Sequence, residues 1–419
     1  MSEKNLSEKL FKPKSKLKQT ETSVLVTYSV PKTHLLKHSS TFEGTSYVSW
    51  YRMINRLIWI WRGNDGLEIE AVLSRIAANN RVRSCEDLLD TVIGYQPGNW
   101  AYEWSQQAMA WQKKALELPT KIAASQAWLR AANLYSIAAY PHLKGDHLAE
   151  QAVLLANKAY ENAAQLTDFR LKKISFKIED GKKELIGFLH LPDTNQGPYP
   201  TILVCGTLDS LQLDYYRLFS QYLAPQGFAM LTLDMPSIGY SIKYKLSQDT
   251  SALHQQVLNQ LANIPWIDHT RIGVIGLRFG ANIALRLAYL EPKCLKGVAV
   301  LGPIVHSLFN EQKYQDQIPV MNIDIFASRL GFYQVDEAVL RSELSCYSLK
   351  KQGLLGRRCP VPFMVVNWQN DVFSPKEDAL LIVRSSIDGK LLTLPAKPLY
   401  QNFHQSLSAV VSWLKSKID

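Results

Sequence analysis

The chain has 419 residues, of which 47% are hydrophobic and 20% charged. This composition is typical of folded proteins and excludes a disordered, collagen-like or coiled-coil chain, while the length predicts two or three domains. The formal net charge is +10. Residues 1–40 hold eight Lys against three Glu and so account for half of the excess. A nucleic-acid-binding surface spread over the whole chain is therefore not expected.

Residues 1–40 are predicted to form a Lys-rich, solvated arm. The first residues lack the apolar core of a secretion signal, and no apolar run approaches the ~20 residues of a spanning helix. The five cysteines are far apart and form no Cys-x-x-Cys pair, which predicts reduced thiols and neither a disulfide framework nor a zinc site. We therefore expect a cytoplasmic protein without a membrane segment.

Residues 41–170 are predicted to form a helical module. Trp100, Trp104, Ala108, Trp111 and Ala115 follow one another at steps of three and four residues, which is the helical period, and two further helical blocks follow at 124–140 and 149–165. So many aromatic residues could form a ligand platform, but helical spacing favours large side chains that fill a core.

Residues 171–419 change to short β-branched runs that alternate with amphipathic stretches. Two runs joined through Glu179-Asp180-Gly181 predict a hairpin. Further strands are predicted at 201–204, 229–233, 272–275, 297–300, 363–366 and 391–394. Helices are predicted near 215–225, 248–261, 280–290, 376–386 and 405–417. This order predicts a mostly parallel, doubly wound sheet with helices on both faces, and a helical lid inserted at about 303–360.

The segment from Arg271 to Ala284 has the pattern of a strand, a sharp turn and a helix, with Gly276 and Gly280 on either side of Arg278. This is the shape of the nucleophile elbow of α/β-hydrolases, Gly-x-Ser-x-Gly, with Arg in place of Ser. Asp371 follows a later strand, at the position of the triad acid, and His404 follows the last strand, ahead of the closing helix. The order elbow, acid, histidine is the α/β-hydrolase order, so we predict that fold.

Two backbone N–H groups are predicted to hold an oxyanion in such a site. Thr207 lies in the loop after the first parallel strand, and Phe279 directly follows the elbow residue. Ser237 and Ser241, in the loop after the next strand, are interpreted as turn residues rather than displaced nucleophiles.

Several long strings of the sequence resemble the fermentation/respiration switch protein family (FrsA), whose members are known as esterases. The strings are Tyr51-Arg-Met-Ile-Asn-Arg-Leu-Ile-Trp-Ile-Trp-Arg-Gly, Asp90-Thr-Val-Ile-Gly-Tyr, Pro141-His-Leu-Lys-Gly-Asp, Leu233-Asp-Met-Pro-Ser, Gly276-Leu-Arg-Phe-Gly-Ala-Asn and Gly353-Leu-Leu-Gly-Arg-Arg-Cys-Pro. The resemblance implies carboxylic-ester hydrolysis. It also implies association with the unphosphorylated glucose-specific enzyme IIA of the bacterial phosphotransferase system.

The arginine at the elbow leaves several functions open. A guanidinium is not a nucleophile, so the first hypothesis is weak ester hydrolysis in which His404, oriented by Asp371, activates water while Arg278 and the two N–H groups hold the oxyanion. The second is a retired hydrolase in which Arg278 binds an anionic metabolite for regulation. Lyase or decarboxylase chemistry is a weaker third hypothesis.

A structural role for Arg278 is also open, as an ion pair with Asp209, Asp234 or Asp371. The sequence has no glycine-rich phosphate loop in the right context, so no nucleotide cofactor is expected.

Overall fold

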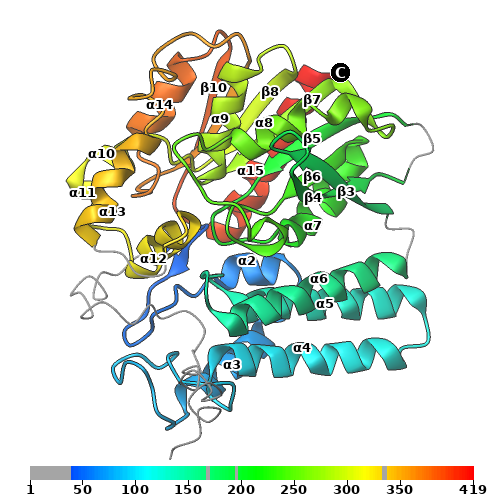
Figure 1. Cartoon of the computed structure of the whole chain (residues 1–419), viewed down its shortest axis with the longest axis vertical. Coiled ribbons are helices and arrows are strands. Elements are labelled where there is room, and N and C mark those ends of the chain that lie inside the picture. Colours follow the sequence, from blue (N-terminus) through cyan, green and yellow to red (C-terminus); the bar gives the residue numbers. More distant parts are fainter. Residues whose placement is uncertain (1–38, 167–169, 194–196, 333–336) are drawn as a thin grey trace, which may run out of the picture.

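The computed structural model describes residues 39–166, 170–193, 197–332 and 337–419 (Figure 1). The predicted arm at 1–40 therefore lies almost wholly outside the described residues. Over the described parts, no helix is long and apolar enough to cross a membrane. All five cysteines are free thiols.

One eight-stranded sheet organises the C-terminal half of the chain, in the order β10-β9-β8-β7-β5-β6-β4-β3. The pairings from β10 to β6 are parallel, and β4 joins β6 antiparallel and forms a hairpin with β3. The strands are β3 (Arg170–Ile178), β4 (Lys183–Leu191), β5 (Tyr199–Cys205), β6 (Ala229–Leu233), β7 (Ile267–Leu277), β8 (Leu295–Leu301), β9 (Phe363–Trp368) and β10 (Gly389–Leu394). The predicted hairpin and parallel strands are confirmed.

Helices cover both faces of this sheet, because successive strand residues point to opposite sides. Val274 of β7 belongs to one hydrophobic core and Ile275 to the other. The first core includes α9 (Gly280–Leu290), α8 (Ala252–Leu258) and α14 (Lys376–Arg384), and the second includes α15 (Leu399–Ile418) and the short α7 (Tyr216–Leu218). The mostly parallel, doubly wound sheet follows from strand runs that are buried on both faces.

The N-terminal helices lie together below the sheet domain (Figure 1). They are α2 (Arg56–Trp61), α3 (Gly66–Ala77), α4 (Trp100–Glu117), α5 (Lys121–Ala139) and α6 (His147–Gln165). The sequence pattern predicted the last three and missed the first two. Trp100 and Trp104 have 0% exposure, so their role as core residues is confirmed. Tyr160 of α6 stacks on Phe188 of β4 with ring centroids 5.7 Å apart, which joins the helices to the sheet.

Among the described residues between β8 and β9 there are four α-helices: α10 (Ser307–Asn310), α11 (Gln312–Gln315), α12 (Val320–Arg329) and α13 (Glu337–Leu344). Helix α12 is tied to the N-terminal region. The Tyr51 hydroxyl donates to Asp324 at 2.5 Å, and the buried Arg329 guanidinium donates to the carbonyls of Pro141, His142 and Leu208. These contacts fix α12 against the N-terminal helices, beside the carboxyl ends of the parallel strands (Figure 1).

Candidate active site

Arg278 occupies a true elbow between β7 and α9, with a φ of +53°. A left-handed backbone is costly for any residue with a side chain, so the turn must be held by its surroundings. A Cβ on Gly276 would lie 2.6 Å from Ala281 Cα, and one on Gly280 would lie 2.0 Å from the Cys205 carbonyl oxygen. The two glycines are therefore required by the close approach of β5, β7 and α9.

The Arg278 guanidinium has no hydrogen-bond donor left for a substrate. A guanidinium carries five N–H donors. Nε and Nη2 donate to the two Glu43 oxygens at 2.8 and 2.5 Å, and Nη1 and Nη2 donate to the two Asp371 oxygens at 2.5 and 3.2 Å. The remaining N–H donates to the Gly302 carbonyl at 3.2 Å. The side chain is 3% exposed. The structural ion-pair interpretation is thus confirmed for Asp371, with Glu43 as a second partner.

Electrostatics keep the Arg278 guanidinium charged. Burial alone disfavours the guanidinium charge, but Asp371 and Glu43 outweigh it and raise the pKa of Arg278 above its ordinary value. Burial raises the pKa of Asp371, and Arg278 opposes that shift. Asp371 also accepts from the backbone N–H groups of Phe373 and Ser374 at 3.0 and 3.3 Å. The acid of the predicted triad is therefore committed to the elbow arginine.

His404 does not lie beside Asp371. Its Nδ1 is hydrogen-bonded to the Tyr222 hydroxyl, and its half-buried ring packs edge-on against Tyr400, with centroids 4.5 Å apart. The predicted Asp371–His404 pair is not formed among the described residues. Helix α15 begins at Leu399, right after Pro398, and so it includes His404, which we had expected in a loop ahead of the helix. Burial lowers the pKa of His404, and the Arg217 charge adds to this shift.

Aromatic rings pack beside the elbow arginine. The Arg278 guanidinium carbon lies 4.9 Å from the centroid of the Phe42 ring. Phe42 packs edge-on against Trp368 and Phe403 at 5.3 and 5.8 Å. Adjacent helix residues differ in direction by about 100°, so Phe403 packs on Phe42 while the next residue, His404, points elsewhere and contacts Tyr222.

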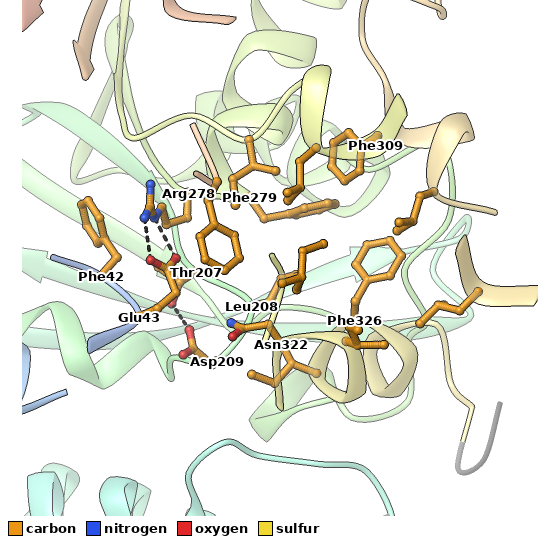
Figure 2. Close-up of a pocket in the computed structure, with 18 of the residues that line it drawn as sticks. Phe42, Glu43, Thr207, Leu208, Asp209, Arg278, Phe279, Phe309, Asn322 and Phe326 are labelled. Carbon is orange, nitrogen blue, oxygen red and sulfur yellow. Dashed lines mark hydrogen bonds and ion pairs between the residues drawn. The ribbon is translucent and has the colours of Figure 1, made fainter. Parts of the chain in front are cut away.

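An apolar cavity opens between the elbow and the helices of the β8–β9 insertion (Figure 2). The empty space inside the cavity and at its open mouth together amounts to about 820 Å³. Figure 2 shows Arg278, Glu43 and Asp209 towards one end and Phe309 and Phe326 towards the other. Its walls include Leu208, Phe279, Ile304, Leu308, Ile318, Ile323, Leu340, Leu344 and Phe373. Such a cavity suits an apolar group that ends in a polar one.

Asp209 is the carboxyl group of this cavity that has no ion-pair partner among the described residues. It accepts from the Thr207 hydroxyl at 2.6 Å. Burial raises the pKa of Asp209, against the opposing hydrogen bond from Thr207. A carboxylate with a raised pKa is a stronger base than an exposed one. Asn322 of α12 also lines the cavity, and its Oδ1 is buried without a hydrogen-bond partner.

The two predicted oxyanion donors differ in availability. The Thr207 N–H donates to the Tyr215 hydroxyl at 2.9 Å and is already in use. Phe279 stands at the N-terminus of α9 and lines the cavity, and its N–H has no acceptor among the described residues. Of the two, only the Phe279 N–H is therefore available to donate a hydrogen bond to an oxyanion.

The remaining polar groups of the predicted loops are structural. The Ser237 hydroxyl donates to the Tyr244 carbonyl at 2.9 Å and the Ser241 hydroxyl to the Asp234 carbonyl at 2.8 Å, which confirms them as turn residues. Asp234 accepts from the backbone N–H groups of Gln212 and Tyr240. The described residues contain no group of three or more His, Cys, Asp or Glu side chains placed to hold a metal ion.

Fold and elbow together define an α/β-hydrolase. Among solved structures, 2,6-dihydroxy-pseudo-oxynicotine hydrolase superimposes with a TM-score of 0.68 at 16% identity, covering 86% of this chain and 95% of that one. AbyA5 superimposes with a TM-score of 0.63 at 19% identity, covering 77% and 90%. At these identities the likeness concerns the fold.

The sequence comparisons identify the family. The profile described as "Esterase FrsA-like" matches residues 1–419. Esterase FrsA of Photorhabdus laumondii subsp. laumondii is 59% identical over 418 residues, and that of Yersinia enterocolitica is 56% identical, each match covering 100% of both chains. The chain belongs to the FrsA-like esterase family and is a hydrolase of the esterase type.

Sequence reasoning found Arg278, Asp371 and the Thr207–Asp209 loop but missed Glu43. This residue lies 235 positions before Arg278, in the turn between the short strands β1 (Ser39–Ser40) and β2 (Gly44–Thr45). A lone glutamate in such a turn carries no local signal. Only an unpaired cation at the elbow, which requires carboxylates when buried, could have prompted a search for it.

Proposed function

We propose that the protein is a carboxylic ester hydrolase of low turnover in which water, and not an enzyme side chain, attacks the ester. The observation that carries this proposal is Asp209, a half-buried carboxyl that lines the apolar cavity and has no ion pair among the described residues. Arg278 cannot serve as a nucleophile, and its donors are all occupied.

In the proposed mechanism, the Asp209 carboxylate removes a proton from water as the water oxygen attacks the ester carbonyl carbon. The carbonyl oxygen becomes an oxyanion and accepts a hydrogen bond from the Phe279 N–H. The C–O bond to the alcohol then breaks, the alkoxide takes the proton from Asp209, and the carboxylic acid is released. Asp209 thus ends in its starting state. Without a covalent intermediate we expect modest rates.

The competing base is His404, oriented by Asp371, as the sequence predicted. That route requires His404 to leave Tyr222 and Asp371 to leave Arg278. Hydrolysis of p-nitrophenyl hexanoate by Asp209→Asn and His404→Ala separates the two routes. We expect kcat to fall roughly 10²-fold or more in Asp209→Asn and to stay within about twofold of wild type in His404→Ala.

The control is Asp249→Asn, because Asp249 is a partly exposed carboxylate that pairs with Arg286 and lies away from the site. It lines neither the apolar cavity of Figure 2, called the lid cavity from here on, nor a second cavity on the other side of the Thr207–Asp209 loop. Circular dichroism checks that each variant folds. Full activity in Asp209→Asn together with loss in His404→Ala would refute the proposal and restore the histidine mechanism.

The regulatory and lyase hypotheses both need Arg278 to bind a carboxylate ligand. Such a ligand would have to displace Glu43 or Asp371, and it would also face the Asp209 carboxyl across the cavity. The negative charges of the ligand and of Asp209 would repel each other, so the geometry argues against both roles for Arg278.

We further propose that the protein works in the cytoplasm and binds the unphosphorylated glucose-specific enzyme IIA. Support comes from the family resemblance, and the net charge of +10 suits association with an acidic surface. Mixing the purified proteins at rising salt concentration tests this. We expect the affinity to fall as ionic strength rises, and a failure to associate at any ionic strength would refute it.

A further inference from the structure

A second cavity lies on the other side of the Thr207–Asp209 loop, between that loop and the N-terminal helices. The empty space inside this cavity and at its open mouth together amounts to about 600 Å³. It shares Phe42, Thr207 and Asp209 with the lid cavity, so the two cavities meet at the proposed base. Its other walls include Trp59, Arg62, Tyr140, Asp214 and Leu277. An ester held at Asp209 can therefore direct its two halves into two different compartments.

The second cavity is more polar than the first and contains hydrogen-bond donors without acceptors. Tyr140 is 5% exposed, and its hydroxyl has no partner. Arg62 forms an ion pair with Asp214, with 3.1 Å between Nη1 and Oδ2, while its buried Nε has no hydrogen-bond partner. A buried donor left unpaired is destabilising, so both groups are expected to meet an acceptor from water or from a ligand.

The charges around this cavity select a neutral ligand over an anion. Asp209 and Asp214 line it, and Arg62 is the cation among its described lining residues. Burial raises the pKa of Tyr140, and the nearby Asp209 and Glu43 charges add to this shift. A carboxylate or phosphate placed here would meet the same negative field. A hydroxyl group avoids this repulsion, because its oxygen accepts from Tyr140 or Arg62 and its proton is donated to a carboxylate.

We infer that this second cavity binds the alcohol half of the ester, and that the alcohol is a small polyol. The substrate class is then a monoacyl ester of a glycerol-like polyol, with its acyl chain among Phe279, Phe309 and Phe326 in the lid cavity. This inference rests on the proposed ester hydrolysis and adds the identity of its substrate. Tyr140 and Arg62 are specificity-determining residues in this assignment.

The test compares 1-monohexanoylglycerol with propyl hexanoate, with acid release followed in a pH-stat. The two esters share the acyl chain and a three-carbon alcohol and differ by two hydroxyl groups. We expect kcat/KM of the wild type to be roughly tenfold or more higher for the glycerol ester. Tyr140→Phe is expected to lower kcat/KM for the glycerol ester roughly fivefold more than kcat/KM for the propyl ester, so that the ratio of the two values falls by that factor.

Arg62→Gln is the second variant, and Tyr135→Phe is the control, because the Tyr135 hydroxyl bonds Gln112 and lies outside both cavities. Equal rates for the two esters in the wild type would overturn the inference and leave the proposed hydrolysis standing. A glycerol preference that survives in both Tyr140→Phe and Arg62→Gln would overturn the assignment of the cavity. If the wild type hydrolyses neither of the two esters, the proposed function itself is refuted.

Discussion

Replacing Arg278 by Met tests whether the elbow arginine is a structural clamp. The change removes five hydrogen bonds and takes away the guanidinium with which two buried carboxylates, Glu43 and Asp371, form ion pairs. Their side chains are 8% and 5% exposed. Removing one side of a buried ion pair typically costs about 3–5 kcal/mol, so we expect a loss of that size in the free energy of unfolding at pH 7.5.

The loss should depend on pH in a defined direction. Burial already raises the pKa of Asp371, and Arg278 opposes this shift, so without Arg278 the folded-state pKa of Asp371 rises further above its unfolded value. A carboxyl with a raised folded-state pKa favours the native state at low pH and loses that contribution as the pH rises. The difference in stability between wild type and Arg278→Met should therefore shrink between pH 7.5 and pH 5. Effects of other titrating groups cancel in this difference.

Urea denaturation followed by tryptophan fluorescence measures both effects. The compensating variant is Glu43→Gln/Arg278→Met/Asp371→Asn, which removes all the charges of the cluster and should recover most of the lost stability. Arg278→Lys keeps the positive charge but cannot hydrogen-bond both carboxylates as the planar guanidinium does. We expect its free energy of unfolding to lie between those of the wild type and Arg278→Met. The reasoning is refuted if Arg278→Met matches the wild type at pH 7.5, or if its deficit grows as the pH falls.

Three further predictions concern the elbow and the core. Arg278→Ser should give no burst of p-nitrophenol in stopped-flow assays, because His404 is bonded to Tyr222 and cannot activate the new hydroxyl; a stoichiometric burst would show that the histidine reaches the elbow. Gly280→Ala should lower the free energy of unfolding by about 3 kcal/mol or more, because its Cβ would lie 2.0 Å from the Cys205 carbonyl oxygen. Gly227→Ala, whose Cβ would have nothing within 4 Å, should lower it by only about 1 kcal/mol in the same denaturation assay. Burial lowers the pKa of His254 to about 4 from 6.5, so its protonation in the unfolded state should remove about 2 kcal/mol of stability between pH 7 and pH 5. His254→Leu should flatten the pH profile by that amount, and an unchanged profile would contradict the assignment.

Most of the fold could be predicted from the sequence because helices and strands are signalled by residues that are close together in the chain. The strand at Val274 and Ile275 and the helix around Trp100 and Trp104 were predicted from the periodicity and composition of a few neighbouring residues. The elbow was recognised because Gly276 and Gly280 meet backbone atoms of β5 and α9 that any such turn must approach. Helices α2 and α3 were missed, and they lack the long, regular spacing that made the later helices visible.

The sequence alone determined the α/β-hydrolase fold, the elbow and the replacement of its serine by arginine, because these depend on the order and type of nearby residues. Tertiary structure decided what the arginine does. Glu43 reaches it from a distant turn, and Asp371 is drawn to it and away from His404. The start of α15 at Leu399 fixed the direction of the histidine. A buried charge must find its partners in space, and spatial proximity between residues far apart in the chain is set only when the whole chain has packed.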